Sequence, residues 1–202
     1  MTQRNSGVLM HISSLPGKYG IGSFGQAAYD FVDFLVETKQ TYWQILPLTT
    51  TSYGDSPYQS FSAIAGNPHL IDFDLLMADG LLEEADVDGV NFGDRPDLVD
   101  YALVYQVRRP ILEKAVQRFL ADDRNKALLA AFEKANSSWL NDYAEFMGIK
   151  ESFGNKALQE WDDKAVIARN DEVLAQYRID LADQIDYFKV CQYFFFSQWK
   201  AL

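Results

Sequence analysis

The residues best suited to chemistry lie in one stretch of this 202-residue chain, between positions 49 and 67. The stretch reads TTTSYGDSPYQSFSAIAGN and combines hydroxyls, aromatic rings, one carboxylate and one amide. Aromatic planes pack against the CH faces of sugar rings, and short donors and acceptors bind sugar hydroxyls. The mixture indicates a carbohydrate-binding loop, although an ordinary polar loop with tight turns remains an open alternative. Its candidate residues are Ser52, Tyr53, Asp55, Ser56, Tyr58, Gln59, Ser60 and Ser62.

Asp55 is the only acid in this loop. Cleavage of a glycosidic bond needs an acid together with a nucleophile or base on the other side of the bond, so one carboxylate is not enough. Within the turn-rich sequence Gly54-Asp55-Ser56-Pro57, we expect the side chain to bond to its own backbone and, in addition, to a sugar hydroxyl.

Other candidate groups point to simpler roles. Gly20, Gly22 and Gly25 match the dinucleotide fingerprint G-x-G-x-x-G, but seven residues separate them from the preceding predicted strand. Because that fingerprint requires the turn to leave the strand directly, a loop that shapes a pocket wall is favoured over nucleotide binding. Two histidines and one cysteine predict neither a disulfide nor a Cys/His metal cluster. His11 is interpreted as a satisfied core residue, Cys191 as a small core hydrophobe, and His69 has no evident partner.

Two short apolar runs flank a helical pattern near the start of the chain. Residues 7–12 and 42–48 read as buried strands, and residues 26–38 place Ala28, Phe31 and Leu35 at helical spacing. Strand, helix and strand in this order form a βαβ unit, so we expect parallel strands covered on both faces.

The remaining chain carries helical patterns. One is predicted to begin at Pro110, a residue type favoured in the first turn of a helix, and others cover 128–132 and 139–147. From Asn170 onward, one long apolar stripe predicts a single helix to the C-terminus without a cap. We therefore expect the natural chain to continue beyond Leu202.

Charge is distributed unevenly along the chain. The formal net charge is −11, yet residues 1–70 contain only seven charged side chains. An acidic protein lacks the basic face that nucleic acids and anionic membranes require. No apolar run is long enough for a membrane span, and the first residues do not form a signal peptide, so we expect a cytoplasmic protein.

Several long strings in the sequence resemble one enzyme family. They are SGVLMHISSLPGKYGIGSFG, YWQILPL, YGDSPYQSFSAIAGNPHLIDFDLL, VDYALVYQVRRP and FFFSQWKAL. They closely resemble the N-terminal portion of amylomaltases, the 4-α-glucanotransferases of glycoside hydrolase family 77 in the α-amylase clan, called disproportionating enzymes in plants.

The resemblance implies an α/β fold, namely the first strands of a TIM (β/α)8 barrel followed by an inserted helical subdomain. Residues 1–74 would form the barrel part with the glucan-site loops, and residues 75–202 the helical insertion. It also implies cofactor-free transfer of α-1,4-glucan segments between maltodextrins or amylose in starch and glycogen metabolism. The family reaction is a retaining double displacement with an Asp nucleophile and a Glu acid and base.

The resemblance also assigns site residues. Tyr58 matches a tyrosine beside the donor sugar, and Asp55, Ser56 and Gln59 line the same loop. Tyr53 and Tyr105 match a second glucan groove found in some members. The family's catalytic carboxylates fall beyond Leu202, so none is expected in this chain, and a metal is not expected either. The missing part of the barrel is thus an expected partner, and a non-catalytic glucan-binding or structural fragment is the alternative.

Overall fold

The computed structural model describes residues 4–95 and 97–202, except for the side chain of Tyr53. Contacts within the chain divide it into two compact units. Unit 1 holds the residues up to Ala121 together with Phe194–Leu202, and unit 2 holds Asp122–Tyr193. The two units are defined by compactness alone. The predicted boundary at residue 74 separates barrel elements from a helical insertion, and it stays a prediction.

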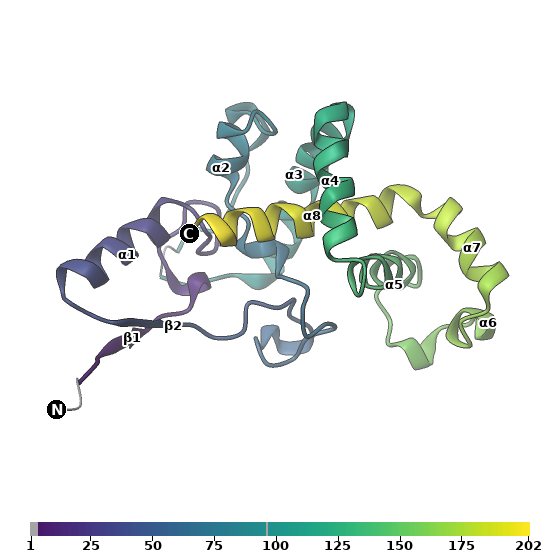
Figure 1. The fold of residues 1–202 in the computed structure, drawn as a ribbon, viewed down its shortest axis with the longest axis horizontal. Helices are drawn as coiled ribbons and strands as arrows, with labels where there is room; N and C mark the ends of the chain where they lie inside the picture. The colour runs from purple at the N-terminus through teal and green to yellow at the C-terminus, as the bar shows by residue number, and fades with distance from the viewer. Residues whose placement is uncertain (1–3, 96) are drawn as a thin grey trace. The chain divides into compact units, whose positions relative to one another are not determined.

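Unit 1 begins with the predicted βαβ unit (Figure 1). Strand β1 (Gly7–Leu9) pairs in parallel with β2 (Tyr42–Gln44), with Gly7 opposite Tyr42 and Leu9 opposite Gln44. Helix α1 (Gln26–Glu37) connects them. The order of elements and the parallel pairing are therefore confirmed, with strands shorter than the apolar runs that predicted them.

The prediction that these strands are buried on both faces is wrong. Leu9 is 56% exposed and Tyr42 is 59% exposed, whereas Val8 and Trp43 are half-buried. The ring of Trp43 packs edge-on against Phe31 of α1, with 4.9 Å between centroids. In this unit α1 covers one face of a two-stranded sheet, which leaves the opposite face open.

Helix α3 (Tyr101–Ala121) is the longest element of unit 1. It begins well before Pro110, so the predicted start is wrong. The carboxylate of Asp100 accepts a hydrogen bond from the Leu103 amide (3.1 Å) and caps the true start. Pro110 instead lies on the exposed side of the helix, where it removes one backbone donor. The other short elements are η1 (Ile12–Ser14), η2 (Tyr53–Asp55), η3 (Pro68–Leu70), α2 (Phe73–Ala78) and η4 (Glu84–Asp86).

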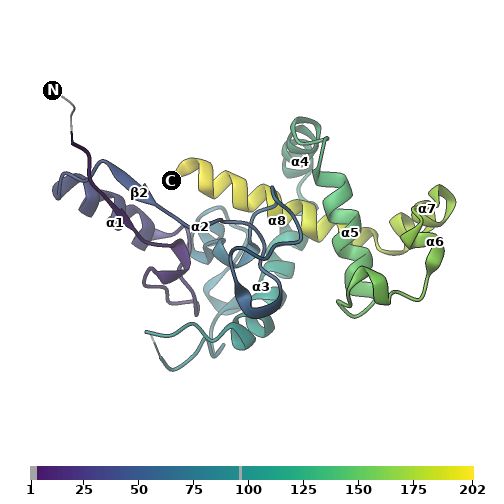
Figure 2. The same cartoon turned by 90° about the horizontal axis from the view of Figure 1, so that it is seen from below.

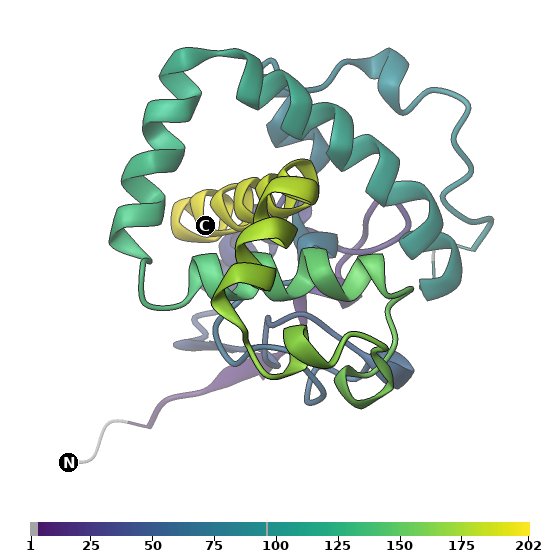
Figure 3. The same cartoon turned by 90° about the vertical axis from the view of Figure 1, so that its right-hand side faces the viewer.

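Unit 2 is helical (Figure 3). The predicted start after Asn170 is confirmed, because its side chain accepts hydrogen bonds from the Glu172 and Val173 amides at 3.1 Å. The single long helix is wrong, since the backbone leaves helical geometry at Leu181. The elements are α4 (Asp123–Ala135), α5 (Leu140–Ser152), η5 (Leu158–Glu160), α6 (Lys164–Ile167), α7 (Asp171–Asp180) and α8 (Ala182–Ala201), whose last residues belong to unit 1.

The end of α8 packs into the core of unit 1. The Gln198 side chain accepts from the Asp72 amide (2.7 Å) and donates to the Asp72 carbonyl (3.1 Å). The Phe195 ring packs edge-on against Phe24 and also fills the space beside Gly66, where a Cβ atom would lie 2.2 Å from the ring. Position 66 therefore requires glycine. Among the described helices, none combines the length and the apolar character needed to cross a membrane.

Candidate functional site

The loop between residues 49 and 67 follows β2 and is closed at its base. Thr49 and Gly66 form an antiparallel bridge, and the Asn67 amide donates to the Leu48 carbonyl (2.9 Å). The paired ends make this a compact loop whose tip lies beside α3 (Figure 2). The packing of Gly66 against Phe195 fixes the base of the loop on the core of unit 1.

Two of the candidate serines form hydrogen bonds within the loop. Ser60 Oγ lies 3.0 Å from Thr50 Oγ1 and donates to the Ser62 carbonyl at 2.6 Å. Ser62 Oγ accepts from the amides of Ile64 (3.1 Å) and Ala65 (3.0 Å). These hydroxyls satisfy the backbone of the turn, so their role is to shape the loop.

Asp55 is anchored by a residue from another element. Tyr105 Oη on α3 donates to Asp55 Oδ1 at 2.7 Å and lies 3.0 Å from Thr51 Oγ1. The expected bond from Asp55 to its own backbone is thus replaced by one from Tyr105. Asp55 adopts a left-handed backbone conformation (φ 54°) directly after Gly54 (φ 75°), which aspartate tolerates better than most residues. Burial and the bond to Asp55 raise the pKa of Tyr105 to about 12, although the Thr51 bond opposes the shift.

His69 packs against Tyr105. Their rings meet edge to face with 4.7 Å between centroids. Burial, with a smaller contribution from the charge of Arg108, lowers the pKa of His69 to about 3, so the imidazole is neutral near pH 7. Its Nδ1 atom is buried and has no hydrogen-bond partner among the residues that the structure describes. This contact joins residues 36 positions apart, and no sequence pattern indicated it.

The side chains that remain open to a ligand lie at the tip of the loop. Tyr58 is 72% exposed, Gln59 is also exposed, and Ser56 is half-buried. Ser56 Oγ accepts from the Tyr58 amide at 3.3 Å, which fixes the turn between them. The loop thus brings Asp55, Ser56, Tyr58 and Gln59 together and adds Tyr105 to that group. The side chain of Tyr53 lies outside what the structure describes.

The glycine-rich segment offers no place for a pyrophosphate. A Cβ atom on Gly25, which precedes α1, would lie 2.1 Å from Asp72 Oδ2. The same carboxylate accepts a hydrogen bond from Ser23 Oγ at 2.6 Å. Since a carboxylate already lies beside the N-terminus of α1, a second anion would be repelled there. The geometry therefore favours a structural role for these glycines.

The remaining candidates have structural surroundings. Cys191 is fully buried, which confirms its predicted place in the core. His11 is half-buried and its Nδ1 has no described hydrogen-bond partner, so the prediction of a satisfied core histidine is wrong. Within residues 4–95 and 97–202, no group of three or more His, Cys, Asp or Glu side chains is placed to hold a metal ion.

Nearly the whole chain matches one protein family. Residues 10–202 match the family described as 4-alpha-glucanotransferase, and the chain belongs to that family. It is 60% identical over 202 residues to the 4-alpha-glucanotransferase of Streptococcus pneumoniae, covering 100% of this chain and 40% of the relative. It is 47% identical over 193 residues to that of Clostridium butyricum, covering 96% and 39%.

Solved structures agree with this assignment. The amylomaltase from Streptococcus agalactiae in complex with acarbose superposes with a TM-score of 0.96 at 60% identity, over 98% of this chain and 40% of that one. The amylomaltase from Corynebacterium glutamicum, at 15% identity and a TM-score of 0.63, covers 98% of this chain and 27% of its own and shares the fold. The chain thus spans about 40% of the length of the curated relatives that it matches.

Proposed function

We propose that this chain is part of a 4-alpha-glucanotransferase that transfers α-1,4-glucan segments from one maltodextrin to the 4-hydroxyl of another. The observation that carries this proposal is 60% identity along the whole chain to a protein of that name. The open loop supports it, because Tyr58 offers an aromatic face and Gln59 offers a donor and an acceptor beside it.

In this proposal the chain forms one wall of the site. Tyr58, Asp55, Ser56 and Gln59 contact the donor sugar next to the bond that is broken. The reaction is a retaining double displacement in which a carboxylate outside these 202 residues attacks the sugar and a carboxylic acid protonates the leaving oxygen. A sugar hydroxyl then displaces the enzyme carboxylate. Transfer prevails over hydrolysis when bound acceptor excludes water from the intermediate.

The same proposal assigns the elements. Strands β1 and β2 with α1 are the first elements of a (β/α)8 barrel, and the helices after residue 74 form an insertion. The support is the superposition on an amylomaltase over 98% of this chain. Since a barrel needs eight strands, the remaining strands come from the part of the relatives that this chain does not cover.

A second function class is a non-catalytic glucan-binding or structural fragment. The observation that favours it is the share of the relatives covered, about 40%. Neither proposal predicts turnover of maltotriose by the 202-residue chain alone, and they differ in whether the chain works within a longer protein that has the transferase activity.

The second groove assigned to Tyr53 and Tyr105 has its own test. The double variant Tyr53→Ala/Tyr105→Ala in the full-length enzyme is expected to impair activity on long amylose more than on maltotriose. Because Tyr105 also holds Asp55, the single variant Tyr53→Ala isolates the groove. Equal loss on both substrates in the single variant would remove the groove assignment.

A further inference from the structure

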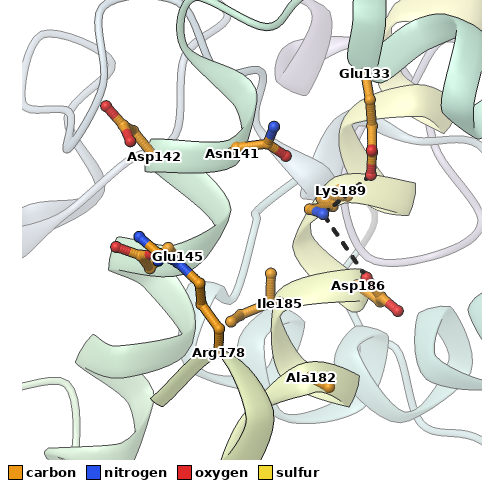
Figure 4. Close-up of a pocket in the computed structure, with 9 residues that line it drawn as sticks. All are labelled: Glu133, Asn141, Asp142, Glu145, Arg178, Ala182, Ile185, Asp186 and Lys189. Carbon is orange, nitrogen blue, oxygen red and sulfur yellow. Dashed lines mark hydrogen bonds and ion pairs between the residues drawn. The ribbon is translucent and has the colours of Figure 1, made fainter. Parts of the chain in front are cut away.

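Unit 2 contains a pocket of about 430 Å³ among α4, α5, α7 and α8 (Figure 4). That size lies within the range of about 300–1,000 Å³ typical of ligand sites. The pocket is separate from the loop at residues 49–67, because all of its lining residues belong to unit 2. Its polar lining includes Glu133, Asn141, Glu145, Arg178, Asp186 and Lys189.

Helical spacing explains how these side chains come to line one space. Ile185, Asp186 and Lys189 lie on one face of α8, at relative positions 0, 1 and 4. Asn141 and Glu145 are likewise four positions apart on α5. The pocket is therefore built on regular helices, which hold its functional groups more precisely than a loop would.

The charged groups in the pocket form pairs. Arg178 donates from Nε to a Glu145 oxygen. Lys189 Nζ lies 3.0 Å from Glu133 Oε1 and 4.0 Å from Asp186 Oδ1. The side chains of Lys189 and Glu145 are only 17% and 11% exposed. Placing charges in partly buried positions costs desolvation energy. The polar lining of this pocket therefore differs from an ordinary exposed surface.

The composition of the lining restricts the class of ligand that the pocket can bind. The four lining acids exceed the two cations, which disfavours an anion, while Arg178 and Lys189 disfavour a cationic ligand. Only Ala182 and Ile185 are apolar, so a hydrophobic ligand is disfavoured as well. Each ion pair places a donor beside an acceptor, which is what a pair of adjacent hydroxyls requires.

We propose that this pocket binds a neutral polyhydroxylated ligand, and specifically a segment of α-1,4-glucan. The choice of glucan among neutral sugars rests on the proposed function. The adjacent hydroxyls of one sugar bind the pairs Arg178–Glu145 and Lys189–Glu133, Asn141 contacts a further hydroxyl, and Ile185 packs against ring CH groups. Unit 2 then binds a part of a long glucan through residues other than those of the loop at residues 49–67.

The test is a titration of the isotopically labelled 202-residue chain with maltoheptaose, followed by NMR at each backbone amide. Asn141→Trp fills the pocket from an exposed position and leaves the ion pairs in place. Lys189→Gln removes the shared donor. Lys134→Gln is the matched control, because it removes one positive charge from an exposed site on α4 outside the pocket lining.

We expect saturable shifts at the amides around Asn141 and Lys189, lost in Asn141→Trp and Lys189→Gln and retained in Lys134→Gln. Shifts confined to residues 49–67 would overturn this inference and leave the proposed function intact. Pocket shifts that persist in Asn141→Trp, or that spermidine produces and maltoheptaose does not, would also overturn it. A failed proposed function would show instead as a full-length protein inactive on maltotriose, with these pocket shifts unaffected.

Discussion

Tyr58 and Tyr105 show how one residue type serves two purposes in the same site. The Tyr58 ring is 72% exposed at the tip of the loop, whereas the Tyr105 hydroxyl is bonded to Asp55. An exposed ring with a free edge can contact a sugar, and a bonded hydroxyl can fix the carboxylate beside it. The two tyrosines therefore differ in what their removal should change.

Tyr58→Phe in the full-length enzyme is expected to lower kcat on maltotriose several-fold. A hydrogen bond that strengthens in the transition state contributes about 0.5–1.5 kcal/mol, which corresponds to roughly 2- to 13-fold in rate. Steady-state kinetics measure kcat and KM separately. Unchanged kcat and KM would reduce Tyr58 to a packing role.

His69 is expected to make unit 1 sensitive to acid. Its pKa of about 3 in the folded chain lies below the value of 6.5 for a free side chain. The unfolded chain therefore takes up a proton first, and the free energy of unfolding falls as the pH drops from 6.5 toward 3. In the His69→Leu variant, the free energy of unfolding should fall by about 1–3 kcal/mol less between pH 7 and pH 4, as measured by urea unfolding at the two pH values. Identical pH dependence in both proteins would contradict the assignment.

At the scale of elements, the loop at residues 49–67 depends on a tether from α3. Tyr105→Phe removes the donor to Asp55, at a cost of about 0.5–1.5 kcal/mol in local opening. We expect faster hydrogen exchange at the amides of Asp55 and Gln59, which bond within the loop. Tyr101→Phe, one turn earlier on α3, is the matched control. Equal exchange in the two variants would rule out the tether.

Asp86 clamps the short helix η4 to α3. Its carboxylate accepts from Arg118, lies 3.2 Å from Lys114 Nζ, and accepts from the Glu83 amide at 2.9 Å. The Arg118 bond is the main cause that lowers the pKa of Asp86 to about 2. Its contribution to stability is present above pH 3.8 and is lost as the pH falls toward 2.

Asp86→Asn should therefore destabilise the chain by about 1–3 kcal/mol at pH 7, and by less at pH 2.5. Urea unfolding at the two pH values measures the difference. The exposed substitution Asp88→Asn is the control. If both substitutions had the same effect at neutral pH, the clamp would be contradicted.

Local patterns were enough to predict some elements and not others. The apolar spacing of α1 and the flanking runs predicted the βαβ order, because these signals lie within a single element. The break at Leu181 has no glycine or proline to mark it, and Pro110 lies inside α3 because the helix begins earlier, after the Asp100 cap. Composition indicated the loop at residues 49–67, but its bond to Tyr105 joins residues 50 positions apart. Such contacts depend on the assembled fold.

At the scale of the whole molecule, each unit shows a distinct kind of surface. Unit 1 exposes strand residues such as Leu9 and Tyr42, together with the aromatic tip of the loop. Unit 2 presents the pocket of paired charges. The exposed face of these strands agrees with the proposal that they belong to a barrel, since the side chains of all strands together fill a barrel interior.

The most direct test of the account compares the 202-residue chain with the full-length protein on maltotriose. Two molecules of maltotriose rearrange to glucose and maltopentaose in the proposed reaction. We expect the full-length protein to form both products, and the folded 202-residue chain to form neither while its loop amides still respond to the sugar. Glucose and maltopentaose from the 202-residue chain alone would contradict the claim that the catalytic carboxylates lie outside it.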